Sequence, residues 1–443
     1  MPVHKKIRLS SFQIIILGFM GVILMGACLL VLPVSSREGV ITPFHEALFT
    51  STSAVCVTGL VVQDTASYWS YFGQVVILVL IQIGGLGVVT VAAMISLLSG
   101  RKISLKQRST MQEAISAPQM GGIVKLTGFI VRTTLIIEFI GAIFMLPVFC
   151  KEQGLKGIWL SFFHSISAFC NAGFDLLGTE HAKYVSLTSY MGHPVINITI
   201  MALIIIGGIG FLTWDDICMN KYRVKNYRMQ SKVILVTTIL LILIPTIYFY
   251  FGEFQQLEWG ERIFASFFQA VTPRTAGFNT ADLTIMTGAG QCIIIILMLI
   301  GGSPGSTAGG MKTTTFAVLF ANAIAVFQKK DYAHFFGRRM EEDVIRNAST
   351  ILTMYLALFL SGGWIISVLE GIELGTCLFE TASAIGTVGL TLGITPELGI
   401  VSQGILIILM FFGRVGGLTL IYAAVSGTQK KLSRLPQGKI MVG

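Results

Sequence analysis

Hydrophobic residues occur in eight long runs along the chain, and short polar segments separate them. The runs lie near residues 10–34, 73–99, 123–149, 191–214, 232–252, 287–327, 347–369 and 399–426. A helix needs about 20 predominantly apolar residues to cross the hydrocarbon core of a bilayer. Each run is long enough for this, and the sixth is too long for one uninterrupted helix. The pattern predicts a helical membrane protein that crosses the bilayer eight times.

A four-residue turn recurs between these runs, each time after a short segment of small, Ser or Thr residues. The four copies are Val57-Thr58-Gly59-Leu60, Asn171-Ala172-Gly173-Phe174, Thr275-Ala276-Gly277-Phe278 and Thr387-Val388-Gly389-Leu390. Their glycines are 114, 104 and 112 residues apart. Self-similarity at a regular spacing indicates a repeated structural unit. We therefore predict four units, with boundaries at 1–100, 101–222, 223–335 and 336–443.

Every unit predicts the same order of elements: a spanning helix, a short helix, the glycine turn and a second spanning helix. The first short helix begins near Pro43 and ends near Val55, so it cannot cross the membrane. Re-entrant backbone is tolerated at membrane depth only where protein buries it or where it lines a watery cavity. Two crossings per unit give all four units one direction, and parallel repeats share an axis along the membrane normal. The predicted fold class is an all-α membrane protein in which four parallel repeats, with four re-entrant pore helices, surround a pseudo-fourfold central pore.

Composition and charge agree with a membrane location. The chain is 53% hydrophobic and 12% charged, whereas soluble domains contain roughly 25% charged residues. The polar segments on one side of the predicted membrane hold 21 basic and 7 acidic residues, and those on the other side hold 6 and 14. The positive-inside rule then places both termini in the cytoplasm. The predicted location of the chain is the cytoplasmic (plasma) membrane. Topology thus accounts for the net charge of +9, and no nucleic-acid partner is predicted.

The glycine turns suggest a site for a monovalent cation. Glycine adopts positive φ at low cost and lets backbone approach a ligand closely, and rings of carbonyl oxygens can replace the hydration shell of K⁺. No turn contains a carboxylate, which argues against a filter for divalent ions. Asp64, Asp175 and Asp282 lie a few residues outside the turns. They are either attractors of cations at a pore mouth or ordinary solvated loop acids.

A glycine cluster follows in the second spanning run of each unit, at 84–87, 207–210, 301–305 and 413–417. In the first two units, close helix packing through small residues is the simpler explanation. The third cluster extends into a segment that cannot be a continuous helix, because proline costs about 3 and glycine about 1 kcal/mol relative to alanine. This segment is Gly301-Gly302-Ser303-Pro304-Gly305-Ser306-Thr307-Ala308-Gly309-Gly310. It is either a mobile gate or a static kink.

Five charged residues fall at membrane depth: Lys125, Arg132, Glu138, Lys312 and Arg414. Ionisable residues in such positions are functional candidates. Arg414 lies level with the last glycine cluster, where an unpaired guanidinium would repel a passing cation. It therefore acts either as a barrier or as a latch on the 301–310 segment, and the adjacent acids at 215 and 216 are its candidate partners.

These residues resemble the Ktr/Trk/HKT superfamily of potassium transporters, in which one chain contains four M1–P–M2 units. The resemblance covers the four turns, the interrupted 301–310 segment and Arg414, and the short segment before the first run is most similar to the KtrB-type membrane subunit. It implies that the turns form a K⁺ selectivity filter and that 301–310, with Lys312 and Arg414, forms an intramembrane gate. It also implies a homodimer in the lipid bilayer, seated on a cytosolic nucleotide-binding ring of KtrA-type RCK proteins.

Two functions compete at this stage. One is channel-like K⁺ uptake, and the other is a carrier that couples cation movement to Na⁺ or H⁺ by symport. Sodium dependence is a family property for which the chain has no motif. The sequence lacks a G-x-G-x-x-G unit, so nucleotide control would need a partner, and it lacks His-Glu-x-x-His and Gly-x-Ser-x-Gly motifs. An enzyme is therefore not predicted.

Overall fold

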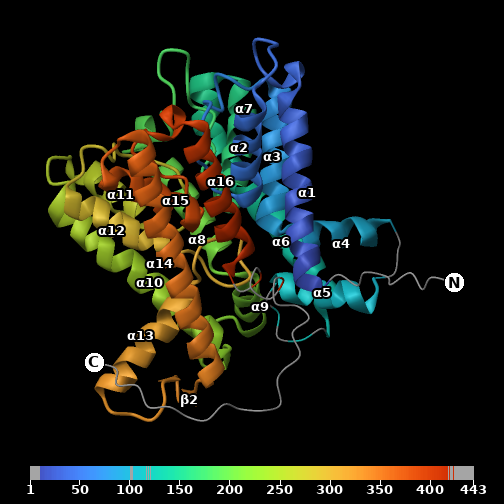
Figure 1. Cartoon of the computed structure of the whole chain (residues 1–443), viewed down its shortest axis with the longest axis vertical. Coiled ribbons are helices and arrows are strands. Elements are labelled where there is room, and N and C mark those ends of the chain that lie inside the picture. Colours follow the sequence, from blue (N-terminus) through green and yellow to red (C-terminus); the bar gives the residue numbers. More distant parts are fainter. Residues whose placement is uncertain are drawn as a thin grey trace.

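The computed structural model describes residues 10–99, 103–115, 117, 119, 121–417, 419 and 423, and the regular secondary structure in them is almost entirely helical (Figure 1). The α-helices are α1 (Ser11–Val31), α2 (Phe44–Cys56), α3 (Tyr71–Leu86), α4 (Val88–Leu98), α5 (Leu105–Ile115), α6 (Ile123–Gln153), α7 (Lys156–Phe169), α8 (Pro194–Gly208), α9 (Phe211–Asn220), α10 (Met229–Tyr248), α11 (Trp259–Val271), α12 (Gly288–Leu299), α13 (Thr313–Phe327), α14 (Glu342–Glu370), α15 (Leu374–Gly386) and α16 (Ile400–Val415). Short helical turns are η1 (Pro33–Ser35), η2 (Thr188–Tyr190), η3 (Val224–Asn226), η4 (Phe249–Glu253) and η5 (Thr395–Glu397). The terminal segments 1–9 and 424–443, on which the predicted topology partly rests, lie outside the described residues.

Four of the described helices are long and apolar enough to cross a membrane: α1, α6, α10 extended by η4, and α14. Two bent pairs, α3 with α4 and α8 with α9, would bring this number to six. Three further apolar helices, α12, α13 and α16, are shorter. Apolar length is therefore distributed as the sequence pattern indicates, but several of the eight predicted crossings are not single long helices.

The predictions of one helix over 73–99 and one over 191–214 are wrong. The first bends by 95° between α3 and α4, and the second bends by 98° between α8 and α9. Gly87 and Gly210 stand at these bends with φ of +85° and +93°. A helix cannot continue through that conformation, which glycine adopts without a Cβ clash. The glycine clusters thus redirect the chain as well as allowing helices to pack closely.

The short helices α2, α7, α11 and α15 are each held between a helix of their own segment and a helix of the preceding segment, with the last segment counted as the one before the first. Within a segment, α1 packs on α2, α6 on α7, α10 on α11, and α14 on α15. Between segments, α3 packs on α7, α8 on α11, α12 on α15, and α16 on α2. The last contact joins the end of the chain to its beginning, so the short helices form a closed arrangement in the upper half of Figure 1.

A small hairpin joins α13 to α14 at the bottom of Figure 1. Its strands, β1 (His334–Phe335) and β2 (Arg338–Arg339), are antiparallel, with His334 opposite Arg339. The two turn residues, Phe336 and Gly337, both have positive φ. This is the conformation of a type I′ turn, whose twist suits a two-residue hairpin.

Candidate functional site

The four glycine turns lie against one another in a closed ring. A Cβ atom added to any of the four glycines would lie under 3.0 Å from a carbonyl oxygen of the next turn. These close approaches run from Gly59 to Ala172, from Gly173 to Ala276, from Gly277 to Val388, and from Gly389 to Thr58. Because the fourth turn meets the first, segments from four parts of the chain surround one axis.

The backbone takes the same path in all four turns. The first residue of each turn has a left-handed conformation, with φ of 58° at Val57, 60° at Asn171, 71° at Thr275 and 51° at Thr387. The glycine two positions later also has positive φ, between +67° and +96°. Positive φ is uncommon for residues other than glycine. Its recurrence at four equivalent positions indicates that one specific backbone shape is required there.

Hydrogen bonds to the preceding short helix fix this shape. The amides of Thr58, Ala172 and Val388 each donate to the carbonyl five residues earlier, at 2.8 Å. Two serine hydroxyls also accept from the backbone amides of the glycines in the turns: Ser53 from Gly59 at 3.1 Å and Ser383 from Gly389 at 3.0 Å. The Ser and Thr residues before the turns therefore serve as local anchors of the backbone.

The third turn departs from this pattern. Ala276 donates to the carbonyl of Thr272, four residues earlier, at 3.0 Å. The hydroxyl of Thr275 is hydrogen bonded to the side-chain amide group of Asn171 in the neighbouring turn, at 3.1 Å. This side-chain link joins the second and third turns and makes the ring only approximately symmetric.

Four carbonyl oxygens of the ring are left without a protein donor. Among the described residues, no hydrogen bond ends on the carbonyl of Thr58, Ala172, Ala276 or Val388, although all four residues are buried. Buried carbonyl groups in native proteins are nearly always paired with protein, water or an ion. The C-terminal ends of the four short helices also lead into the turns, and these ends carry partial negative charge. The ring is thus suited to hold cations.

A cavity of about 220 Å³ opens on one side of the ring. The glycines of the four turns line it together with the three predicted acids, Asp64, Asp175 and Asp282. Asp64 is buried and accepts hydrogen bonds from Ser67 and from the amide of Tyr184 at 2.8–2.9 Å. Burial, with a smaller contribution from the nearby charge of Asp64, raises the pKa of Asp175 to about 7, although a hydrogen bond from the amide of Leu177 acts in the opposite direction. Asp282 is exposed, whereas Asp64 is buried and Asp175 is partly buried, so the three acids differ in their access to solvent.

The predicted break over 301–310 is present between α12 and α13, and the broken segment is held by its neighbours on several sides. Ser303 and Thr307 donate from their backbone amides to Gly208 and Gly207 at the end of α8, at 3.0 and 3.2 Å. The amide of Gly310 donates to the carbonyl of Gly413 on α16, at 3.1 Å. The segment therefore lies across the interior, between two of the helices that surround the ring.

Two basic side chains contact this segment. Lys312 donates to the carbonyls of Ala308 at 2.8 Å and Gly309 at 3.4 Å. Arg414 donates to the carbonyl of Thr307 and, on α3, to those of Gly84 and Gly85. Both cations line a second cavity, of about 250 Å³, which also contains Gly85 and Gly305. Positive charge thus lies beside the segment, in a cavity separate from the one that the acids line.

The predicted partners of Arg414 are wrong. Asp215 and Asp216 instead pair with Arg228, at 3.1 and 3.4 Å. In the described part of the chain, Arg414 has backbone carbonyls as partners and no carboxylate. Spacing along the chain could not reveal this arrangement, because backbone acceptors carry no sequence signature.

Of the other charges predicted at membrane depth, Lys125 and Arg132 are exposed and Glu138 is buried. Glu138 accepts from the side-chain amide of Gln82 at 3.1 and 3.2 Å, and it contacts the thiol of Cys170, the residue before the second turn. Sequence analysis singled out Glu138 but missed Gln82. The signal that could have identified Gln82 was its polar side chain inside the apolar run 73–99.

The glycine clusters have a further packing role beside the ring. A Cβ atom on Gly84, Gly207 or Gly413 would lie under 3.0 Å from the carbonyl oxygen of Val55, Phe169 or Ile385, respectively. Each of these carbonyls comes two residues before the left-handed residue of a turn. The glycines therefore allow the second helix of a segment to support the backbone that positions the ring. Gly301 and Gly302 do not make this contact and belong to the broken segment instead.

Apolar helices around a ring of unpaired, buried carbonyls define a helical integral membrane protein suited to cations. The family model described as "TrkH: Cation transport protein" matches residues 9–435. The chain belongs to this family, as its resemblance to the Ktr/Trk transporters predicted, and the family consists of cation transporters rather than enzymes.

Several relatives match over nearly their whole lengths, among them the following two. The chain is 40% identical to the potassium/sodium uptake protein NtpJ of Enterococcus hirae, with 98% of each chain covered. It is 38% identical to the Ktr system potassium uptake protein B of Bacillus subtilis, with 100% of this chain and 98% of that protein covered. The fold is similar to the crystal structure of the potassium transporter TrkH from Vibrio parahaemolyticus, with a TM-score of 0.73 and 18% identity. The match covers 95% of this chain and 86% of the TrkH chain.

Proposed function

We propose that this protein carries K⁺ into the cell across the cytoplasmic membrane, with the four glycine turns as its selectivity filter. The unpaired carbonyls of Thr58, Ala172, Ala276 and Val388 are the observation that carries this proposal. Their oxygens would replace water around a dehydrated K⁺ ion. Inward movement would be driven by the membrane potential, which is worth about 2.3 kcal/mol per charge for each 100 mV. Both termini would lie in the cytoplasm.

The proposed architecture is four parallel M1–P–M2 repeats, with boundaries at 1–100, 101–222, 223–335 and 336–443. The short helices α2, α7, α11 and α15 would be the pore helices. Their closed sequence of contacts with α16, α3, α8 and α12 supports this assignment. In this arrangement the bent pairs and the broken third pair are the second helices of their repeats.

In the proposed mechanism the 301–310 segment is a gate inside the membrane. Its backbone adjoins the fourth turn, because a Cβ atom on Gly309 would collide with the side chain of Thr387, and Lys312 and Arg414 would place positive charge on the route of an ion that has left the filter. Conduction would require the segment to move and these side chains to leave the route. Arg414, with acceptors on the segment and on α3, would hold the closed position.

The proposed assembly is a homodimer of this chain, as the family resemblance implies. Its proposed regulatory partner is a cytosolic, nucleotide-binding RCK ring of the KtrA type. The relative in Bacillus subtilis is named as part of a Ktr system, which supports a partner-dependent mechanism. The relative in Enterococcus hirae is named for both potassium and sodium uptake, so Na⁺ must be tested as a transported or coupling ion. A Na⁺- or H⁺-coupled carrier would then show saturable exchange without single-channel currents.

The test is K⁺ and Na⁺ flux into liposomes that contain the purified protein, with the wild type beside Gly277→Ser. A serine Cβ at 277 would collide with the carbonyl of Val388, so K⁺ selectivity should fall. Gly260→Ser is the control, because a Cβ there meets nothing within 4 Å. Unchanged K⁺ over Na⁺ selectivity in a folded Gly277→Ser protein would contradict the filter assignment.

A further inference from the structure

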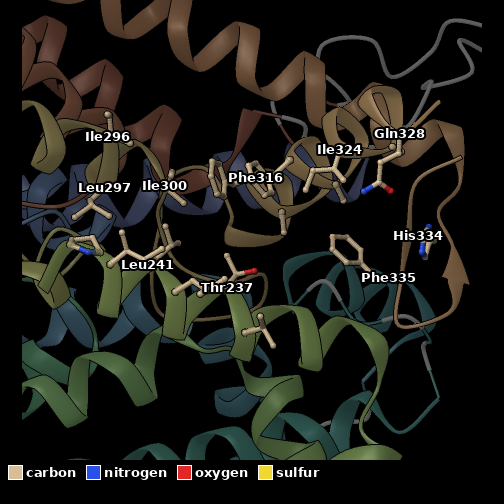
Figure 2. Close-up of a pocket in the computed structure, with 18 of the residues that line it drawn as sticks. Thr237, Leu241, Ile296, Leu297, Ile300, Phe316, Ile324, Gln328, His334 and Phe335 are labelled. Carbon is tan, nitrogen blue, oxygen red and sulfur yellow. The ribbon is translucent and has the colours of Figure 1, made fainter. Parts of the chain in front are cut away.

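A deep apolar groove of about 680 Å³ lies between α10, α12 and α13, away from the ring and its two cavities. It exists because the broken segment separates α12 from α13, while α13 packs against α10 and α14. Figure 2 shows Thr237, Leu241, Ile300 and Phe316 around the groove and Gln328, His334 and Phe335 at its right-hand end. Its volume is within the range of about 300–1,000 Å³ that is usual for small-molecule sites.

The walls of the groove are apolar and open to the outside of the helix bundle. Leu240 is 50% exposed, Ile296 is 52% exposed and Phe320 is 60% exposed. Phe320 is stacked on Phe316 along α13, with ring centroids 6.1 Å apart. In a bilayer such a surface faces hydrocarbon, and a concave shape between three helices fits an extended chain better than it fits a flat protein surface.

The groove ends in a polar pocket of different character. Lys330 and His334 line both spaces, and the second one, of about 620 Å³, is completed by the hairpin and the segment before it. That pocket contains three basic residues, Lys329, Lys330 and Arg339, and a single acid, Asp331. An apolar groove therefore continues directly into a basic pocket.

The basic residues of this pocket are weakly neutralised by protein. Arg339 has Glu342 at 3.9 Å as its ion-pair partner, and both side chains are mostly exposed. Its guanidinium also lies 5.2 Å from the centre of the Tyr332 ring. Lys329 and Lys330 take part in no ion pair with a described residue. These charges are available to an anionic group at the open end of the groove.

We infer that the groove and the basic pocket together bind one anionic phospholipid, with an acyl chain between α10, α12 and α13 and the headgroup phosphate at Lys330 and Arg339. Basic pockets between helices at a membrane surface are suited to anionic headgroups. The combination of an apolar channel with positive charge at one end matches this ligand and no water-soluble anion. The site touches Ile300, which precedes the broken segment, so the bound chain would lie beside the proposed gate.

Native mass spectrometry of the purified full chain tests this inference without relying on transport. The protein is equilibrated with phosphatidylglycerol or with phosphatidylcholine of the same acyl chains, and retained lipid is counted after detergent washing. We expect about one retained phosphatidylglycerol per chain. Each basic side chain near an anionic lipid surface contributes about fivefold in binding, which corresponds to about 1 kcal/mol.

Two variants address the two ends of the site. Lys330→Ala/Arg339→Ala should reduce the preference for phosphatidylglycerol by about 25-fold. The matched control, Arg223→Ala/Lys225→Ala, removes two exposed basic residues from η3 and its flank and should leave the preference unchanged. Ala321→Trp should fill the groove and abolish retention, whereas Ile140→Trp, on the exposed face of α6, should not.

Three results would overturn the inference. The first is equal retention of both lipids by the wild type, and the second is equal losses in the Lys330/Arg339 variant and its control. The third is an altered oligomeric state of Ala321→Trp with unchanged lipid retention, which would assign the groove to a contact with a second copy of the chain. Thermal unfolding of each variant separates loss of binding from loss of fold. Because no flux is measured, failure here leaves the proposed K⁺ transport function untouched.

Discussion

The guanidinium of Arg414 on α16 donates a hydrogen bond to the backbone carbonyl of Thr307, 107 residues earlier in the chain. The same side chain reaches the carbonyls of Gly84 and, at 3.2 Å, Gly85 on α3. One charged group therefore ties the broken segment to two helices that support the ring. Hydrogen bonds to a charged donor contribute roughly 1.5–3 kcal/mol each, more than neutral ones.

Replacing Arg414 with alanine should raise K⁺ flux several-fold. The variant loses both the latch on Thr307 and a positive charge beside the proposed ion route, and these losses act in the same direction. Flux of K⁺ into liposomes is the measurement, with the yield of monodisperse protein recorded in parallel. Arg414→Lys is the matched control, because lysine keeps the charge but cannot donate in the fixed fork geometry of arginine.

If Arg414→Ala lowers folded yield without changing flux per folded protein, the residue is structural. If Arg414→Lys behaves like alanine, geometry matters more than charge.

Shortening the broken segment by deleting residues 304–306 should also raise K⁺ flux. The deletion removes the part of the segment that approaches Ile115, whose carbonyl lies under 3.0 Å from a Cβ built on Gly305. A gate that cannot reach its closed position leaves the route open. The measurement is K⁺ flux normalised to protein that elutes as the wild type does in gel filtration. Unaltered flux from a folded deletion variant would make the segment a static kink.

The pKa of Asp175 predicts a pH dependence of K⁺ entry from the side of the acidic cavity. Burial raises this pKa to about 7, so the carboxyl is mostly neutral below that pH and negative above it. Lowering the pH on that side from about 8 to about 6 should therefore slow K⁺ entry, by roughly twofold to tenfold, because the mouth loses a charge that attracts cations.

Asp175→Asn should remove this dependence, and Asp282→Asn, which leaves Asp175 intact, should preserve it. The measurement is the initial rate of K⁺ flux at a series of external pH values with the internal pH held constant. An unchanged pH profile in Asp175→Asn would assign the titration to another group.

Gly84→Ala should destabilise the folded protein by about 1–3 kcal/mol, the usual cost of overpacking a tight core position. The added methyl group would collide with the carbonyl of Val55, which belongs to the backbone of α2 and cannot move aside independently. Gly128→Ala is the control, because a Cβ there meets nothing within 4 Å. Thermal unfolding in detergent reports the difference, and equal stability of the two variants would show that the close approach is not required.

Local features of the chain were readable from sequence because each depends on a few neighbouring residues. The end of α2 near Val55, the break over 301–310 and the fourfold recurrence of the turn all follow from apolar length, glycine and proline. These properties act through backbone conformation within one segment, so position in the fold does not alter them. The position of Glu138 inside an apolar run was likewise a local signal, although its burial emerged only in the structure.

Other features arise only when distant segments meet. The 95° bend at Gly87 was invisible in the run 73–99, because a glycine inside an apolar stretch is compatible with a straight helix until tertiary contacts select positive φ. The partners of Arg414 were also missed, since its acceptors are backbone carbonyls, which every residue possesses. The order of the ring, from Gly59 through the other turns and back to Thr58, is a matter of packing between segments about 110 residues apart in sequence. Hydrophobic periodicity specifies which surfaces are buried, but the geometry of the assembled helices specifies which neighbours they meet.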